Sequence, residues 1–165
     1  MRIHRFITLL FAAATAAGLA FAPPAQAQDN IVKLVSSENG KCLQPINGSG
    51  DRGVAIVQQP CNGSTAQQWT VTAVSSTAVH LVNGSSHLCL DARGGATNGT
   101  PIQQWPCNKI TNENWSFGIT NNLLSSGVSG TFSHCVATPG DQNGLAMSLR
   151  FCTITPSMVW TRPPG

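Results

Sequence analysis

The feature that most constrains this chain is a regular spacing of its cysteines and tryptophans. The six cysteines form three pairs whose members recur every 45 to 47 residues: Cys42 and Cys61, Cys89 and Cys107, Cys135 and Cys152. A tryptophan follows the second cysteine of each pair by eight residues, at Trp69, Trp115 and Trp160. Self-similarity at one period predicts three structurally equivalent units.

An alignment on the second cysteine of each pair needs no gaps and adds a further match. It superimposes Gly53–Ile56, Gly99–Ile102 and Gly144–Met147, which all begin with glycine and end with an apolar residue. The three units then cover about residues 30–76, 77–121 and 122–165, and are called units 1, 2 and 3 below. Three units of about 46 residues are too few for most solenoids and propellers, so a closed threefold arrangement fits better.

The units read as β-structure. Short apolar runs such as Ile31–Val35, Ala78–Val82 and Trp115–Ile119 are separated by turn residues. Asn39-Gly40 and Asn83-Gly84 stand where a hairpin needs residues with positive φ. No segment after residue 30 combines a 3.6-residue apolar period with helix start and stop signals. We therefore predict an all-β fold with about four short strands in each unit, or about twelve in all.

The N-terminal segment, residues 1–27, has the features of a secretory signal peptide. Arg2 and Arg5 precede the apolar run Phe6–Ala22, and Ala25-Gln26-Ala27 forms a small-residue cleavage site. An uncleaved membrane anchor is the alternative interpretation of the apolar run. Cleavage would leave Gln28 as the first residue of a single domain, residues 28–165, exported to an extracellular or periplasmic space.

Charge excludes two classes of partner. Removing residues 1–27 takes away two of the nine basic residues and none of the six acidic ones, which leaves 7 − 6 = +1. A nearly neutral chain without runs of Lys or Arg is not typical of nucleic-acid binding or of attraction to acidic membranes. No apolar run after Ala27 approaches the roughly 20 residues that span a bilayer, so membrane insertion is not expected.

Six cysteines in a small exported domain predict disulfide bonds, for which 15 pairings are formally available. Equivalent units require equivalent bonds, which selects the three pairs within units: Cys42–Cys61, Cys89–Cys107 and Cys135–Cys152. Zinc is the competing interpretation, but the chain has no Cys-x-x-Cys pair and its histidines follow no ligand spacing. We expect neither a metal nor another cofactor.

Several motifs resemble the repeats of ricin-B-type lectins. They are Gly40-Lys-Cys-Leu43, His87-Leu-Cys-Leu-Asp91, Ile102-Gln-Gln-Trp-Pro-Cys107 and Gln67-Gln-Trp69. The resemblance covers the whole chain after the signal segment and implies a β-trefoil, in which the tryptophan of a Gln-x-Trp motif packs into a shared core. The first residue of that motif is Gln67 in unit 1, but Glu113 in unit 2 and Met158 in unit 3. Because of this departure, the sequence does not predict the local hydrogen bonds of this motif in units 2 and 3.

The same resemblance implies a sugar site in unit 2. In the family, an Asp two residues after the first cysteine, an aromatic residue two before the second, and an Asn before the Gln-x-Trp motif line a shallow pocket. Asp91, Trp105 and Asn112 match these positions, and Gln103 matches a further lining position. Units 1 and 3 lack both the acid and the aromatic residue. At the positions of Asp91, Trp105 and Asn112, unit 1 has Gln44, Gln59 and Ala66, and unit 3 has Ala137, Arg150 and Ser157. Trp105 also lies outside the repeated tryptophan position, so we expect a ligand rather than the core to require it.

These residues predict a secreted carbohydrate-binding lectin domain without catalysis, whose glycan ligand could be of the galactose or the xylose type. The alternative is a non-catalytic secreted β-trefoil that binds a protein partner, as an inhibitor or a toxin-delivery subunit. An enzyme would need a catalytic pair, and Asp91 with Glu113 is the nearest candidate for glycoside hydrolysis. Glu113 occupies a structural position, however, and His80, His87 and His134 have no placed Ser or Asp partner, so we expect them to be solvated.

Overall fold

A computed structural model describes residues 30–118, 124–127 and 133–165. The predicted signal segment lies outside the described residues, as does Ile119 at the end of one predicted apolar run. The described parts of the chain contain thirteen short strands, four 3₁₀ helices and no α-helix. The strands are β1 (Ile31–Lys33), β2 (Val35–Ser36), β3 (Cys42–Pro45), β4 (Ile56–Gln59), β5 (Gln68–Ala73), β6 (Val79–Asn83), β7 (Cys89–Ala92), β8 (Ile102–Trp105), β9 (Trp115–Phe117), β10 (Leu124–Ser126), β11 (His134–Ala137), β12 (Ser148–Phe151) and β13 (Trp160–Thr161). Only Leu34 separates β1 from β2, so these two count as one interrupted strand of unit 1. Each unit then contributes four strands, as predicted.

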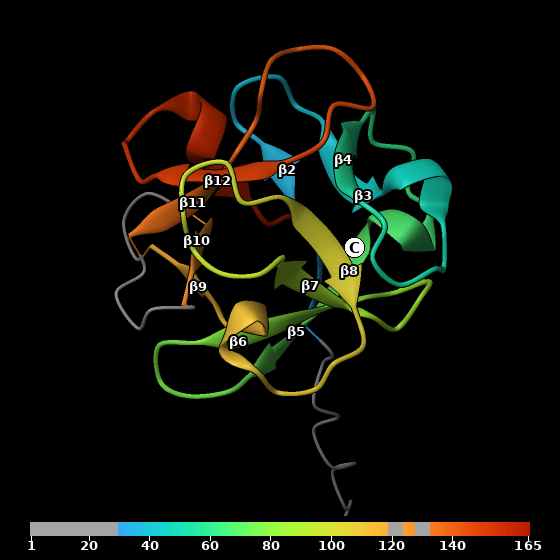
Figure 1. Ribbon diagram of the computed structural model, residues 1–165. Helices are drawn as coiled ribbons and strands as arrows, with labels where there is room; N and C mark the ends of the chain where they lie inside the picture. Colours follow the sequence, from blue (N-terminus) through green and yellow to red (C-terminus); the bar gives the residue numbers. More distant parts are fainter. Residues whose placement is uncertain (1–29, 119–123, 128–132) are drawn as a thin grey trace, which may run out of the picture.

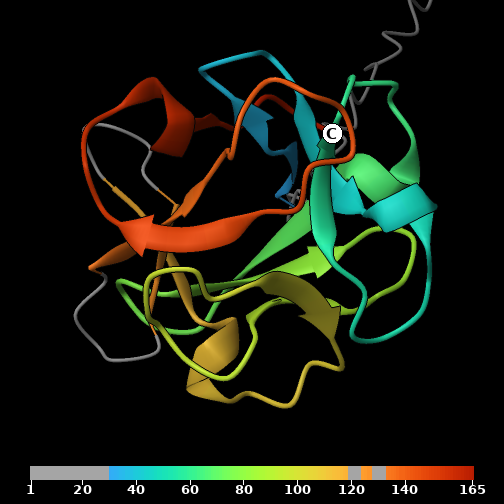
Figure 2. The same cartoon turned by 45° about the horizontal axis from the view of Figure 1, so that its top comes forward.

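Every strand pairing is antiparallel, and each unit folds its two middle strands into a hairpin: β3 with β4, β7 with β8, and β11 with β12. The outer strands join the units, because β5 pairs with β6 and β9 pairs with β10. The last strand, β13, returns to pair with β2. The two ends of the described chain therefore meet, and the three units surround a common centre (Figures 1 and 2). This is the β-trefoil.

Three loops connect neighbouring units through backbone hydrogen bonds. Gly53, Gly99 and Gly144 all have positive φ, and each backbone N–H donates to a carbonyl of an adjacent unit at 2.8 Å. The acceptors are the carbonyls of Gln104, Leu149 and Gln58, which lie at equivalent positions in β8, β12 and β4. The gapless alignment of these three segments is thus confirmed in three dimensions, and glycine is favoured because the left-handed region strains other residues.

Two buried glutamines reinforce these contacts and were not anticipated from the sequence. The amide of Gln58 donates to the carbonyls of Gly140 and Gln142 at 2.6 and 2.7 Å. The amide of Gln104 donates to the carbonyls of Ser49 and Asp51 at 2.8 and 2.7 Å. Each glutamine therefore satisfies two carbonyl groups of a loop from another unit, which stabilises the packing between units. Both glutamines stand three residues before the second cysteine of their unit, and this shared position is the sequence signal that could have predicted their common role.

The core is centred on the three repeated tryptophans, all of them fully buried. Each indole N–H donates to a carbonyl of its own unit: Trp69 to Leu43 at 3.2 Å, Trp115 to Leu90 at 2.9 Å and Trp160 to Val136 at 3.0 Å. Buried leucines from all three units pack around them, among them Leu43, Leu90 and Leu149. The repeated tryptophan position is therefore a core position, because it buries a large apolar ring and also pairs its polar N–H.

The turn predictions were right in unit 1 and wrong in unit 2. Gly40 has φ +70° in the turn between β2 and β3, as expected. In unit 2 the equivalent position is His87, with φ +58°, whereas Gly84 does not adopt positive φ. A Cβ atom on Gly84 would lie 3.0 Å from the Thr65 carbonyl oxygen. Glycine is favoured at position 84 because the backbone at Thr65 approaches too closely for a side chain, and not because the position needs positive φ.

The disulfide bonds are Cys42–Cys61, Cys89–Cys107 and Cys135–Cys152, which confirms the pairing inferred from the repeat. Each closes a loop of similar length, with sequence separations of 19, 18 and 17. Loops of this size give about 3 kcal/mol of stabilisation by restricting the unfolded chain.

Replacing both Cys89 and Cys107 with serine is therefore expected to lower the free energy of unfolding by about 3 kcal/mol. Urea denaturation of the oxidised variant and parent checks this, with the parent in reducing buffer as the control that loses all three bonds. A variant with the parent's denaturation midpoint would show that this bond adds no stability.

Candidate functional site

The four predicted sugar-site residues all belong to unit 2. Asp91 lies in β7, Gln103 and Trp105 lie in β8, and Asn112 lies in the 3₁₀ helix η3 (Thr111–Glu113). Asp91 pairs directly with Gln103 across the two strands, so their side chains share a face, and Trp105 is two residues further along that face. The structure brings Asp91 and Gln103 into contact, with the Gln103 amide donating to Asp91 Oδ1 at 2.7 Å.

Asn112 is half-buried on η3, which contacts β7. No hydrogen bond joins its side-chain amide to another of the described residues. A common site for Asn112 with Asp91 and Trp105 stays a prediction.

Asp91 is an unusual carboxylate because it is only 2% exposed and forms no ion pair with a Lys, Arg or His of the described residues. An ion pair elsewhere in the structure joins Lys41 to Asp141. Burial raises the pKa of the Asp91 carboxyl above 3.8, the hydrogen bond from Gln103 opposes this, and the nearby Glu113 carboxylate raises the pKa further. Only Oδ1 accepts a hydrogen bond within the described residues, and Oδ2 is not sealed from solvent. Asp91 can therefore accept hydrogen bonds from a ligand.

The equivalent positions in the other two units are closed. In unit 1, Gln44 accepts a hydrogen bond from the Gln67 amide at 2.8 Å, so the two side chains satisfy each other. In unit 3, Ala137 and Met158 form a small apolar cluster with the Cys135–Cys152 disulfide. Among these positions, unit 2 alone has a carboxylate with an unpaired oxygen.

The residue that opens the Gln-x-Trp motif has one structural task in all three units. It accepts a hydrogen bond from the backbone N–H that follows the second cysteine: Asn62 to Gln67 at 2.8 Å, Asn108 to Glu113 at 3.1 Å, and Thr153 to the Met158 sulfur at 3.4 Å. The substitutions in units 2 and 3 therefore preserve this loop contact. Glu113 is fully buried and also accepts from the Lys109 N–H at 3.0 Å, so it is not accessible as a general acid or base.

Trp105 differs from the prediction in one respect. It is half-buried and lies against the loop that precedes β4 of unit 1. A Cβ atom on Gly53 would approach its ring to 3.4 Å, and the Arg52 guanidinium carbon is 5.7 Å from the ring centroid. Packing within the protein thus explains why part of the indole surface is buried, because the threefold arrangement brings a loop of unit 1 over β8. The remaining surface is open to solvent.

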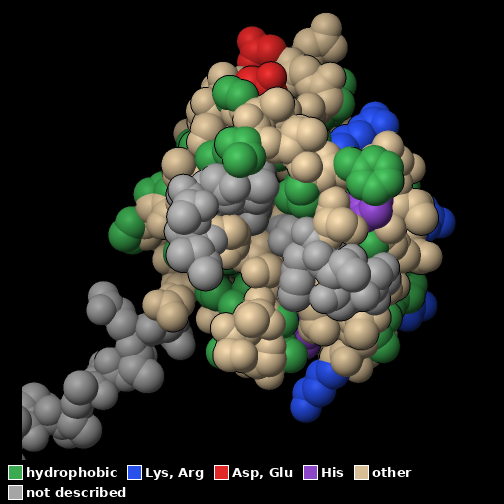
Figure 3. Space-filling model, turned by 90° about the vertical axis from the view of Figure 1, so that its left-hand side faces the viewer, with side chains coloured by type: hydrophobic (Ala, Val, Ile, Leu, Met, Phe, Trp, Pro, Cys, Tyr) green, Lys and Arg blue, Asp and Glu red, His purple; other side chains and the backbone are tan. Residues whose placement is uncertain are grey.

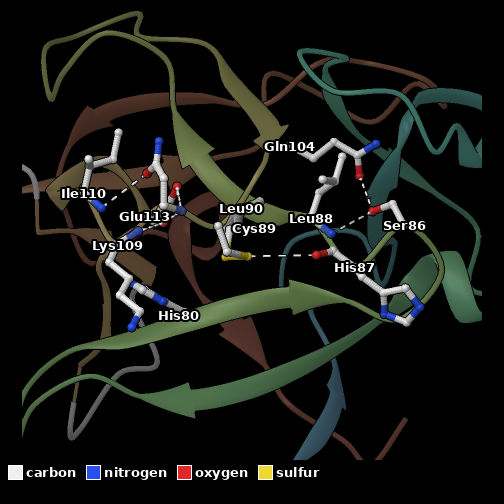
Figure 4. The surroundings of a disulfide bond; sticks show 12 residues. His80, Ser86, His87, Leu88, Cys89, Leu90, Gln104, Lys109, Ile110 and Glu113 are labelled. Atoms are coloured by element: carbon white, nitrogen blue, oxygen red, sulfur yellow. Dashed lines mark hydrogen bonds between the residues drawn. A yellow bond between two sulfur atoms is a disulfide. The ribbon is translucent and has the colours of Figure 1, made fainter.

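His80 was expected to be solvated, but it is 9% exposed. Its Nε2 lies 3.1 Å from Asn114 Oδ1, and Figure 4 shows it beside Glu113 and Lys109, next to the Cys89–Cys107 disulfide. Side-chain atoms of His80, Cys89 and Glu113 lie within 4.8 Å of one another, as metal ligands do. The sulfur is already bonded to Cys107 and Glu113 already accepts three backbone hydrogen bonds, so the cluster does not suit a metal ion.

Three cavities lie elsewhere in the part of the molecule that the structure describes. One of about 440 Å³ is lined by Asn30, Val32, Val71 and Arg162, and one of about 270 Å³ opens between the β5–β6 connection and β9. A third, of about 370 Å³, is lined by Thr72, Ala73, Val74, His80 and Lys109. None of the three includes Asp91 or Trp105. The face drawn in Figure 3 shows small, scattered groups of hydrophobic side chains with Lys and Arg near its edges, and no broad patch of one charge.

The threefold strand pattern and the tryptophan core that the three units share define a β-trefoil. The family model described as "Ricin-type beta-trefoil lectin domain-like" matches residues 20–105 and 74–139. The chain belongs to this family of ricin-type β-trefoil lectin-like domains, as its motifs suggested. A search of the curated proteins finds no match to the sequence.

Solved structures agree on the fold. The designed threefold protein ThreeFoil matches with a TM-score of 0.75 at 21% identity, over 81% of this chain and 98% of that one. An exo-β-1,3-galactanase from Clostridium thermocellum matches with a TM-score of 0.75 at 25% identity, over 82% of this chain but 30% of the enzyme. The C-terminal half of an earthworm R-type lectin, solved with GalNAc, matches with a TM-score of 0.65 at 14% identity, over 80% of this chain and 96% of that one.

Proposed function

We propose that this chain is a secreted, non-catalytic carbohydrate-binding module with one sugar site in unit 2, formed by Asp91, Gln103, Trp105 and Asn112. The observation that supports it most is the contrast between units: the Asp91 carboxylate has an oxygen left for a ligand, whereas Gln44 is paired with Gln67 and Ala137 is packed against Met158. The half-buried indole of Trp105 on the same face adds an apolar surface.

This combination suits a pyranose. The Asp91 carboxylate accepts hydrogen bonds from neighbouring hydroxyl groups, and the amides of Gln103 and Asn112 fix their orientation. The indole face contacts the apolar C–H face of the ring. The GalNAc bound to the earthworm lectin favours a galactose-type ligand, while a xylose-type ligand has the same recognition chemistry. A single shallow site of this kind corresponds to about −4 kcal/mol, or a Kd near 1 mM.

Export is supported by two features. Three disulfide bonds are typical of oxidising compartments outside the cytosol. Residues 1–27, with the pattern of a cleaved signal peptide, would direct the chain there. Within the described ranges, no helix is long and apolar enough to cross a membrane.

A glycan array probed with the folded, oxidised protein tests this function. We expect binding to glycans that present terminal or accessible galactose- or xylose-type residues, strengthened when the glycan is clustered on the surface. Hydrolysis of a bound glycan would show that the protein is an enzyme. Absence of all glycan binding, with tight capture of a protein partner, would instead favour the inhibitor or toxin-delivery function.

Replacing Asp91 with asparagine is expected to weaken binding of an array-identified sugar at least about tenfold, since charged acceptors form the stronger hydrogen bonds. Calorimetric titration measures the loss, and Gln44→Ala in unit 1 is the matched control that retains the parent's affinity. Thermal melts of both variants verify folding. Equal affinity of Asp91→Asn and the parent would remove Asp91 from the site.

A further inference from the structure

The dipeptide Asn-Gly is frequent in this chain and chemically reactive. It occurs six times, beginning at Asn39, Asn47, Asn62, Asn83, Asn98 and Asn143. Because glycine has no side chain, its backbone nitrogen can approach and attack the amide carbon of the asparagine before it. That nitrogen must lose its hydrogen, and the asparagine side chain must reach it. The hydrogen bonds and backbone angles of each pair therefore decide which pairs can react in the folded protein.

In four of the six pairs, a backbone carbonyl holds the glycine N–H. The N–H groups of Gly40, Gly84, Gly99 and Gly144 donate to the carbonyls of Ser36, Gln68, Leu149 and Gln58, respectively, at 2.8 to 2.9 Å. The Asn83 side chain is in addition fully buried, and its amide donates to the Ala66 carbonyl at 2.9 Å. A hydrogen bond opposes loss of the amide hydrogen and fixes the nitrogen in place, so these four pairs are protected.

The fifth pair, Asn47-Gly48, is restrained by its backbone conformation. It lies within the 3₁₀ helix η1 (Ile46–Gly48), where Asn47 has φ +55° and ψ +18°. At this ψ the Gly48 nitrogen is turned well away from the side-chain carbon of Asn47. The Ser49 N–H donates to the Ile46 carbonyl at 3.0 Å and closes the turn around the pair. Attack at Asn47 therefore needs this turn to open.

The sixth pair, Asn62-Gly63, has neither restraint. Both residues are exposed, in the loop between Cys61 and the 3₁₀ helix η2 (Thr65–Gln67). Among the described residues, none accepts a hydrogen bond from the Gly63 N–H or from the Asn62 side-chain amide. A Cβ atom on Gly63 would meet no atom within 4 Å, so water has access to this peptide.

The Asn62 side chain is also held beside the peptide that would attack it. Its Oδ1 accepts from the Ser64 N–H at 2.9 Å, which closes a turn around the Gly63 peptide. Asn39 and Asn83 form the same turn with the next residue but one. The feature that distinguishes Asn62 from these two is therefore the glycine N–H that no described residue holds.

We propose that Asn62 is a site of spontaneous deamidation, which reacts in the folded protein before the other five Asn-Gly pairs. The Gly63 nitrogen forms a bond to Asn62 Cγ, and the bond from Cγ to the side-chain nitrogen breaks. That nitrogen leaves as ammonia with the hydrogen that Gly63 gives up. Water then opens the cyclic imide at either carbonyl, which leaves aspartate or isoaspartate at position 62. The net charge of residues 28–165 falls from +1 to 7 − 7 = 0.

Peptide mapping by mass spectrometry tests the order of reaction. Folded, oxidised protein is incubated in mildly alkaline buffer, and all six Asn-Gly peptides are followed over time. We expect the Asn62 peptide to gain aspartate and isoaspartate at least about fivefold faster than any other. In the reduced and urea-unfolded chain, which is the control, the six rates should converge. Equal rates in the folded protein, or faster reaction at another pair, would overturn the proposal.

A pair of variants tests the role of Gly63. Gly63→Ala places a methyl group beside the attacking nitrogen, and isoelectric focusing should show the acidic form arising much more slowly than in the parent. Gly40→Ala is the matched control, because Gly40 also has positive φ and open space around it. It should acidify at the parent's rate. Thermal melts verify folding, and Asn62→Gln, whose longer side chain closes a ring slowly, replaces Gly63→Ala if that variant does not fold. Acidification of the folded variant at the parent's rate would disprove the assignment.

This modification is independent of the proposed sugar site. Asn62 belongs to unit 1, whereas the four predicted sugar-site residues belong to unit 2. Failure of the glycan array would therefore leave the deamidation proposal standing, and failure of the peptide mapping would leave the proposed function standing.

Discussion

Replacing Trp115 with alanine is expected to lower the free energy of unfolding by about 3–5 kcal/mol, which is the range for truncating a large buried aromatic residue. Trp115 is fully buried in the core that the three units share, and its indole N–H donates to the Leu90 carbonyl at 2.9 Å. The substitution leaves a cavity and also removes the partner of a buried carbonyl group. A loss of this size is a large fraction of the stability of a domain of this length.

Urea denaturation followed by circular dichroism measures this loss. The matched variants Trp69→Ala and Trp160→Ala should show losses in the same range, because their side chains have the same burial and the same type of hydrogen bond. A Trp115→Ala protein that unfolds at the parent's denaturant concentration would contradict the assignment of this position to the core.

Replacing Trp105 with alanine is expected to abolish measurable sugar binding and leave the fold intact. The indole is the one aromatic surface among the predicted site residues, and stacking on it supplies much of the affinity of a shallow site. Trp105 is half-buried against Gly53 and Arg52, so a stability loss of about 1 kcal/mol from this packing and the cation–π contact is expected as well. Calorimetric titration with the array-identified sugar, and thermal melts in parallel, separate the two effects.

Arg52→Ala is the control for Trp105. It removes the cation beside the indole but keeps the ring, and we expect it to retain sugar binding. Trp105→Ala would disprove the site if it bound sugar like the parent. If it unfolded as readily as Trp115→Ala, Trp105 would be a core residue instead.

The pH dependence of stability has a definite sign for Asp91. Its pKa in the folded protein is raised above 3.8, so the folded chain binds this proton more tightly than the unfolded chain does. The contribution of Asp91 to stability therefore becomes more favourable as the pH falls through the raised pKa towards 3.8. This gain is absent from Asp91→Asn.

Features that depend on local order along the chain were predictable. Cysteine spacing gave the three disulfide bonds, and the repeated tryptophan gave the core position, because equivalent units must repeat both. Asp91 and Gln103 were assigned to one site, and they are in contact because their strands form a hairpin within unit 2. Their sequence separation is small, so the turn between β7 and β8 sets their register.

Features that depend on contacts between units, or on the depth of a side chain, were not predictable. The sequence by itself determined the threefold repeat, the pairing of cysteines and the positions that must be apolar, because these follow from spacing within each unit. Only the tertiary structure decided that the Gly53 loop lies against Trp105, that Gln58 and Gln104 join units, and that His80 is buried. The physical reason is that these contacts depend on how each unit is rotated and packed against the next, and many side chains far apart in sequence set that packing together.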